Sequence, residues 1–190
     1  MTQTRLMNVL AAAMILAWIA PCAANAEGKM SDLEGEWSGS GMERDTPFES
    51  MEKATCQSKI RADQQRMSNE IVCMKQSGAR KTMHMQVNLE GTKLTGQVVQ
   101  SRTLPRQPTQ TRKGSVLGVR TGNSADVQIQ FPGLMMPAAR SRLTVLTPSS
   151  YSLRVEAMGA VMMDMTFKRV GPPKETNQEA AANQEATPAQ

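Results

Sequence analysis

Hydrophobic and polar residues alternate one by one through the middle of this chain, and the helical spacing of apolar residues is nearly absent. The clearest alternating runs are 54–61, 82–89, 126–131, 151–156 and 161–168. Successive side chains of a β-strand point to opposite faces, so each run predicts a strand with one buried face and one solvent-facing face. The pattern therefore predicts an all-β protein.

Short turn-forming segments separate the predicted strands, at 90–93 (EGTK), 121–124 (TGNS) and 147–150 (TPSS). Strands joined in chain order by tight turns form an antiparallel meander. We expect about eight to ten strands closed into a lipocalin-like barrel, because closure buries the single apolar face and removes exposed edges. A two-sheet sandwich is the alternative. Two irregular stretches, 101–111 with two prolines and the apolar 132–140, predict loops, the first one mobile and basic.

The N-terminal segment has the layout of a secretory signal peptide. Arg5 precedes an apolar run at 6–20, Pro21 ends that run, and small residues at 24–26 predict cleavage before Glu27. A membrane anchor, the alternative, needs about twenty apolar residues. We therefore expect a periplasmic or secreted protein with no transmembrane segment in the mature chain.

The C-terminal segment 171–190 is built of Pro, Ala, Gln and Glu, with almost nothing to bury, and predicts a disordered tail. The expected organisation is a signal peptide at 1–26, a β-barrel domain at 27–170 and this tail. Cys22 falls within the signal peptide. Lipidation of Cys22 is an alternative that Pro21 disfavours, because a lipoprotein signal has a small residue there.

Two cysteines remain after export, Cys56 and Cys73, each in a strand-like segment. An even pair in an oxidising compartment predicts a disulfide between neighbouring strands of a hairpin. The formal net charge of the chain is +5, which favours an anionic partner such as a lipid headgroup or an acidic protein, although solubility also accounts for it. Nucleic acid is not expected, because the compartment is wrong and no aromatic residues interleave the basic ones.

A short motif at each end of the predicted barrel resembles the lipocalin-like, or calycin, barrels. Gly35-Glu36-Trp37 opens the first strand, and Arg169 closes the last one. In calycins, a GxW motif and a basic residue of the last strand pack together and plug the closed end of the barrel. The resemblance implies that Gly35, Trp37 and Arg169 are structural.

A longer series of motifs resembles a family of small exported single-disulfide β-barrels of alphaproteobacteria that has no assigned activity. It comprises LxGxWxGxG at 33–41, the two cysteines, GxVxGxR at 114–120, FPGL at 131–134 and TFKR at 166–169. The layout is also similar to that of periplasmic inhibitors of secreted metalloproteases. In those inhibitors an extended N-terminal segment enters the protease cleft, and the matching segment here, 27–32, is short.

Methionine is unusually abundant, with 16 residues and dense clusters at 83–85 and 162–165. Thioethers together with imidazole suit Cu(I), and Met83 and Met85 would share one strand face. His84 would point to the opposite face. The interpretation that we favour is that methionine fills the core of a chain with only 3% aromatic residues.

Four basic residues, Arg102, Arg106, Arg112 and Lys113, lie in or beside the longest predicted loop. They would meet at one end of the barrel as an anion-binding or partner-binding site, or remain a solvated loop.

No catalytic function is expected. His84 is the only histidine, and the chain contains no GxSxG, HExxH, phosphate-binding or dinucleotide-binding motif. No cofactor is implied. The sequence predicts a non-catalytic periplasmic or envelope protein that binds a small apolar ligand or an envelope protein, with its oligomeric state open. The alternatives are a barrel that binds proteins as the protease inhibitors do, and a periplasmic Cu(I)-binding protein.

Overall fold

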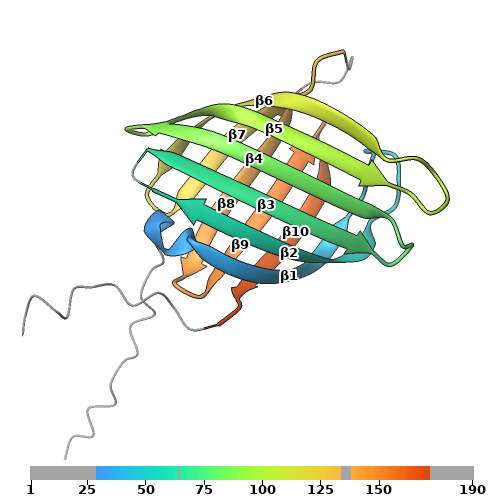
Figure 1. Ribbon diagram of the computed structural model, residues 1–190, viewed down its shortest axis with the longest axis horizontal. Helices are drawn as coiled ribbons and strands as arrows, with labels where there is room; N and C mark the ends of the chain where they lie inside the picture. The colour runs from blue at the N-terminus through green and yellow to red at the C-terminus, as the bar shows by residue number, and fades with distance from the viewer. Residues whose placement is uncertain (1–28, 64, 134–137, 172–190) are drawn as a thin grey trace, which may run out of the picture.

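The computed structural model describes residues 29–63, 65–133 and 138–171. They form ten antiparallel strands, preceded by one turn of 3-10 helix, and the strands close into a barrel (Figure 1). The elements in chain order are η1 (Met30–Leu33), β1 (Gly35–Glu43), β2 (Glu52–Ala62), β3 (Arg66–Lys75), β4 (Arg80–Glu90), β5 (Lys93–Thr103), β6 (Gln110–Thr121), β7 (Ser124–Gln130), β8 (Ala139–Thr147), β9 (Ser150–Ala157) and β10 (Ala160–Arg169).

Each strand pairs with its neighbours in the chain, and β1 pairs with β10 to close the barrel. The closing register runs from Trp37 opposite Arg169 to Glu43 opposite Met163. The predicted meander barrel is therefore confirmed, and the alternative of a two-sheet sandwich is wrong. Closure leaves no strand edge without a backbone partner, which is the physical reason why a barrel is favoured over an open sheet.

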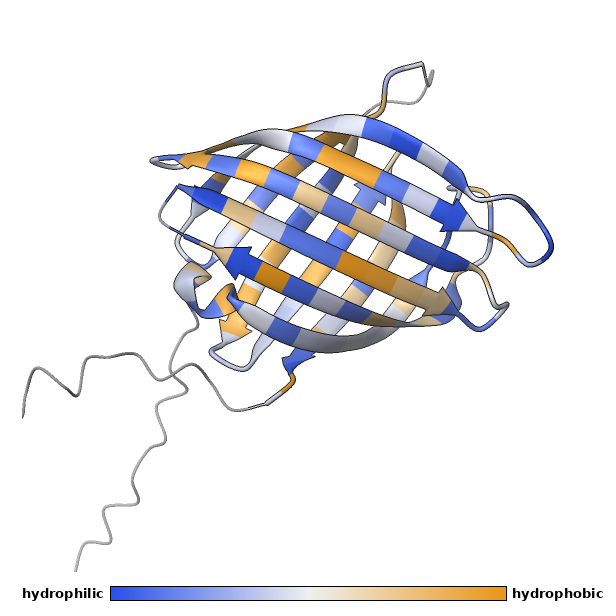
Figure 2. Ribbon diagram, in the orientation of Figure 1, coloured by the Kyte–Doolittle hydropathy of each residue, from blue (hydrophilic) through white to orange (hydrophobic). Residues whose placement is uncertain are grey.

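The alternation in the sequence corresponds to the two faces of the barrel wall. In β2, Ala54, Cys56, Ser58 and Ile60 are buried while the residues between them are exposed. The same alternation of apolar and polar positions is visible along the strands in Figure 2.

The predicted disulfide between Cys56 and Cys73 is confirmed. The two residues are directly opposite each other on β2 and β3, and both are buried in the interior. The bridge therefore fixes the first long hairpin of the barrel from its inner face.

The predicted loop at 101–111 is much shorter in the structure than the sequence indicates. Strand β5 continues to Thr103 and β6 begins at Gln110, so only residues 104–109 lie between them. Both prolines fall in this turn, and flanking hydroxyl groups pair across the hairpin, Ser101 with Thr111 at 2.9 Å and Thr103 with Thr109 at 2.8 Å. The prolines therefore mark the turn alone.

The second predicted loop, 132–140, is also shortened, because β8 begins at Ala139; residues 134–137 lie outside the described residues. The predicted signal peptide at 1–26 and nearly all of the predicted tail also lie outside them. Among the residues that the structure describes, no helix has the length and apolar character needed to cross a membrane.

Candidate functional site: an interior cavity with a charged mouth

One end of the barrel is closed by η1 and by an aromatic cluster. Tyr151 lies edge-on to Trp37, with ring centroids 4.9 Å apart, and stacks on Phe167 at 4.6 Å. All three rings are buried, and burial raises the pKa of the Tyr151 hydroxyl well above its ordinary value. Gly39 allows this packing, because a Cβ there would lie 2.6 Å from the Phe167 ring. This half of the interior is filled.

Arg169 ties the closed end together. Its guanidinium carbon lies 4.3 Å from the centre of the Trp37 ring, and its Nη1 donates a hydrogen bond to the Glu34 carbonyl at 2.7 Å. Further bonds go to the carbonyl oxygens of Asp32 and of Pro148. Gly35 makes room for it, since a Cβ there would lie 2.3 Å from Nη1 of Arg169. The structure thus brings the three predicted plug residues into direct proximity.

The opposite half of the barrel contains a cavity of about 460 Å³. Its walls carry small or flexible apolar side chains from strands all around the barrel, including Ile71, Met83, Ile129, Val155, Ala157 and Met163. Trp37, Tyr151 and Phe167 fill the other half, whereas the aromatic residue that lines this cavity, Phe131, lies at its mouth against Arg112. The cavity opens at the end of the barrel where β1 finishes.

Charged side chains ring the mouth of this cavity, and Asp45 lies at their centre. Its carboxylate accepts a hydrogen bond from Nζ of Lys75 at 2.7 Å, and it forms ion pairs with Nη2 of Arg102 at 2.7 Å and with Nζ of Lys81 at 3.3 Å. Lys81 also pairs with Glu43, whose side chain is completely buried. Most of these charges are nearly inaccessible to water, so each one depends on its partners.

The charged side chains around the mouth set the pKa of Asp45. Burial alone would raise the pKa of its carboxyl group, but the hydrogen bond from Lys75 and the charges of Lys81 and Arg102 outweigh burial, and the net pKa is lowered. Asp45 is therefore ionised at neutral pH and orients the basic side chains around the opening.

Arg112 lies at the same mouth but has a different environment. Its Nε donates to the side-chain oxygen of Gln100 at 2.9 Å, and its guanidinium carbon stacks 4.2 Å from the centre of the Phe131 ring. Desolvation, and then the charge of Arg102, hold the pKa of Arg112 below its ordinary value, while Asp45 opposes the shift. No carboxylate among the described residues lies within ion-pair distance of Arg112.

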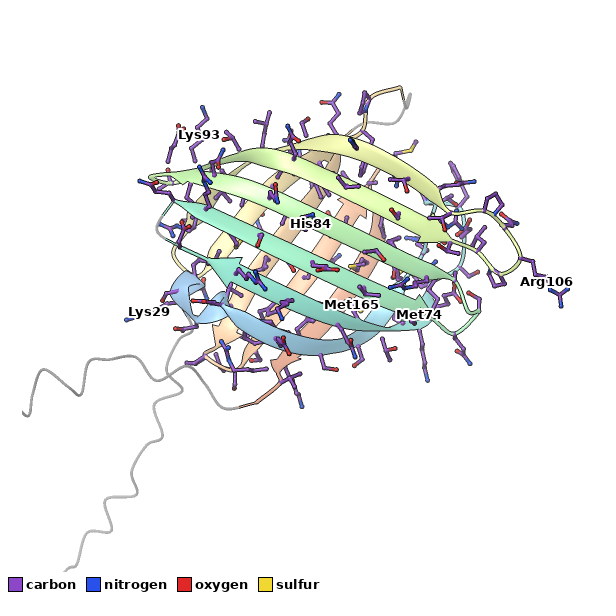
Figure 3. The ribbon with its side chains drawn as sticks, in the orientation of Figure 1. Lys29, Met74, His84, Lys93, Arg106 and Met165 are labelled. Atoms are coloured by element: carbon purple, nitrogen blue, oxygen red, sulfur yellow. A yellow bond between two sulfur atoms is a disulfide. The ribbon has the colours of Figure 1, made fainter. Side chains whose placement is uncertain are left out.

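The structure separates the four basic residues that the sequence grouped together. Arg102 and Arg112 point to the mouth from β5 and β6. Arg106 is exposed in the turn between these strands and projects away from the barrel (Figure 3), and Lys113 is exposed on the outer surface of β6. The group is therefore one inward-facing pair and two solvent-facing residues.

Met83, His84 and Met85 are placed as the alternation predicts. Met83 lines the cavity, Met85 is buried beside it along β4, and His84 is exposed on the outer face of that strand (Figure 3). His84 therefore does not share the interior with the two thioethers. The prediction that Met162 faces outward is wrong, because the pairing of β10 with β9 shifts register between Val161 and Met163 and Met162 lines the cavity. The described residues contain no cluster of three or more His, Cys, Asp or Glu side chains arranged to hold a metal ion.

Sequence reasoning missed the inward-facing charges at Glu43, Lys75 and Lys81. Residues two positions apart on a strand share a face, and this rule would have found them. Lys75 is two residues after the buried Cys73, and Lys81 is two residues before Met83. A charged residue on the buried face of a strand needs a partner, so such positions near strand ends mark a polar cluster at the end of the barrel.

Fold and site together define a class: a single-disulfide, ten-stranded antiparallel barrel with one plugged end and one end that opens into an apolar cavity. Comparisons of this chain with protein-family models and with curated proteins give no match. Of the resemblances noted from sequence motifs, the structure supports the closed antiparallel barrel and the disulfide between Cys56 and Cys73.

Proposed function

We propose that this protein is a non-catalytic carrier that binds a small, largely apolar ligand inside its barrel, in the periplasm or another part of the cell envelope. The observation that carries the proposal is the cavity of about 460 Å³ with apolar walls and one open end. Pockets that hold small molecules usually measure about 300–1,000 Å³ and are lined mainly by apolar side chains with a few polar groups. Burial of a ligand's apolar surface would provide most of the binding free energy.

Export is part of this proposal, and two features support it. The N-terminal sequence is typical of a signal peptide, and the disulfide between Cys56 and Cys73 suits an oxidising compartment. A carrier in the envelope would meet apolar molecules that have to cross an aqueous space.

A native mass spectrum of protein purified from a periplasm tests the carrier function. We expect additional mass that is released on denaturation and identifies the ligand. The variant Ala157→Phe places a ring in the cavity wall and should abolish this mass, whereas Ser38→Phe, on the exposed face of β1, should retain it. A bare polypeptide in the wild type, together with no binding of added apolar compounds, would contradict the proposal.

Cu(I) binding is a second candidate, and one observation favours it: Met83, Met162 and Met163 line the same cavity, with Met85 buried next to Met83. Thioether sulfur is a soft ligand that suits Cu(I). Titration against a chromophoric Cu(I) chelator should then show weaker binding by the double variant Met83→Leu, Met85→Leu. Met74→Leu, at an exposed outward-facing position, is the control. Equal affinities of all three proteins would eliminate this function.

A protease-inhibitor function gains less support from the structure. The segment that would enter a protease cleft overlaps η1 (Met30–Leu33), which is held against the closed end by the bond from Nε1 of Trp37 to the Leu33 carbonyl. Binding to secreted proteases remains testable by a pull-down with the purified barrel.

A further inference from the structure

The positive charges at the cavity mouth are only partly compensated by acids. Lys75, Lys81 and Arg102 pair with Asp45, with Glu43 and with Glu52, whose oxygen lies 3.3 Å from Nζ of Lys75. These ion pairs balance three cations against three acids. Arg44 and Arg112 also line the cavity, and neither forms an ion pair with an acid among the described residues. The Arg44 guanidinium donates to the backbone carbonyl oxygens of Val161 and Pro47, whereas Arg112 contacts only side chains. The mouth therefore carries excess positive charge directly above apolar walls.

Arg112 is also held in a geometry that leaves donors available. The stacking on Phe131 and the bond from Nε to Gln100 fix the plane of the guanidinium group, and both contacts are with uncharged groups. The side chain remains exposed to solvent at the opening. A guanidinium group offers paired N–H donors that match the two oxygens of a carboxylate or a phosphate.

Arg102 strengthens the preference for an anion without occupying the same position. Its Nη2 is engaged by Asp45, and its Nε is buried with no hydrogen-bond partner among the described residues. Desolvation and then the repulsion from Arg102 lower the pKa of Arg112, and the charge of Asp45 acts in the opposite direction. An oxyanion placed beside Arg112 would relieve the repulsion, whereas a cationic head would increase it.

We propose that the ligand of this barrel is a single-chain amphiphile with an oxyanion head, which Arg112 binds at the mouth while the apolar chain lies along the cavity walls. The inference rests on the proposed carrier function and specifies its ligand class. The shared chemistry is an oxyanion at the end of an aliphatic chain, as in a fatty acid carboxylate or an alkyl phosphate. The walls supply affinity for the chain, and Arg112 supplies the selection of the head.

Isothermal titration calorimetry with decanoate, decyl phosphate and decanol tests this proposal on the purified barrel at neutral pH. The three probes carry the same chain and differ in the head, so the ratio of their affinities isolates the contribution of the head. We expect the substitution Arg112→Gln to lower the ratio of decanoate affinity to decanol affinity about tenfold, the typical contribution of a hydrogen-bonded charge. The tighter of the two anions identifies the preferred head.

Lys113→Gln is the matched control, because it removes the same charge from the next residue, on the outer face of β6. Its affinity ratio should equal that of the wild type, and circular dichroism should show the same fold in both variants. Added salt should weaken decanoate binding more than decanol binding.

The outcomes separate this inference from the carrier function. If decanol binds and the ratio of decanoate affinity to decanol affinity is the same in the wild type and in Arg112→Gln, the ligand does not have an anionic head bound by Arg112. The carrier function would then still hold. Binding of none of the three probes would contradict the carrier function and, with it, this inference.

Discussion

Replacing Arg169 with methionine should open the plugged end of the barrel and destabilise the fold. Methionine keeps much of the length of the side chain but removes the charge and all of the N–H donors. The substitution takes away the contact with the Trp37 ring at 4.3 Å and three bonds to backbone carbonyl oxygens, of Asp32, Glu34 and Pro148. These carbonyl groups belong to the segment before β1 and to the turn before β9, so one side chain on β10 joins both segments at the closed end.

The magnitude follows from these contacts. A hydrogen bond from a charged donor contributes about 1.5 kcal/mol or more, and a cation–π contact at a partly exposed site contributes about 0.5–1 kcal/mol. The simple total is about 5 kcal/mol. Arg169 is only half-buried, so water would satisfy part of what the carbonyl groups lose. We therefore expect the free energy of unfolding to fall by about 3 kcal/mol.

Urea unfolding measured by the fluorescence of Trp37 and by circular dichroism provides the assay. With a slope of about 2 kcal/mol per molar urea, the midpoint should fall by roughly 1.5 M. Lys168→Met is the matched control, because Lys168 is the exposed neighbour on β10 and loses the same charge. If Arg169→Met shifts the midpoint no more than Lys168→Met does, Arg169 is not the residue that holds this end closed.

Three further predictions concern the disulfide, the closed end and the mouth. Replacing Cys56 and Cys73 together with alanine should lower the free energy of unfolding by about 3 kcal/mol, the value for a closed loop of this size, as measured by urea unfolding of the variant and the oxidised wild type. Gly35→Ala should lower the thermal midpoint, because φ is +144° at this position and the added Cβ would meet Arg169; an unchanged midpoint would show that the plug tolerates a side chain. Asp45→Asn should reduce the loss of thermal stability at low pH. The pKa of Asp45 is lower in the folded state than in the unfolded chain, so its ionised form stabilises the folded state fully above about pH 4. This contribution is lost as the pH falls through the pKa of Asp45 in the folded state. Thermal melts of both proteins from neutral pH down to about pH 2 measure it, and parallel acid limbs would contradict the ion-pair assignment.

The strands and their faces were predictable because alternation is a local property. The alternation at 54–61 places Cys56 on the inner face of the barrel, whichever strand pairs with it. This follows because the position of a residue along its own strand decides which face its side chain occupies. The turn between β5 and β6 was predicted too long because the prolines were read as breaking the flanking strands. Cross-strand pairing of Ser101 with Thr111 extends the hairpin beyond the point that local composition suggests.

The cavity and its mouth depended on residues that are far apart in the chain. Lys81 and Arg102 are opposite each other on the neighbouring strands β4 and β5. Asp45, in the segment after β1, reaches them across the rim of the closed barrel. The sequence identified Arg102 and Arg112 as basic positions but could not separate them from Arg106 and Lys113, whose directions depend on where β5 ends and β6 begins.

The amino-acid sequence by itself determined an all-β chain, most of the inner and outer positions in the five clearly alternating strands and the pairing of its two domain cysteines, because side-chain alternation and turn chemistry act between near neighbours. Only the tertiary structure decided that ten strands close the barrel, that one half is filled by Trp37, Tyr151 and Phe167, and that the other half stays hollow. The volume left inside a barrel depends on which side chains share a level of its interior. That is a property of strand register around the whole circumference rather than of any segment of the chain.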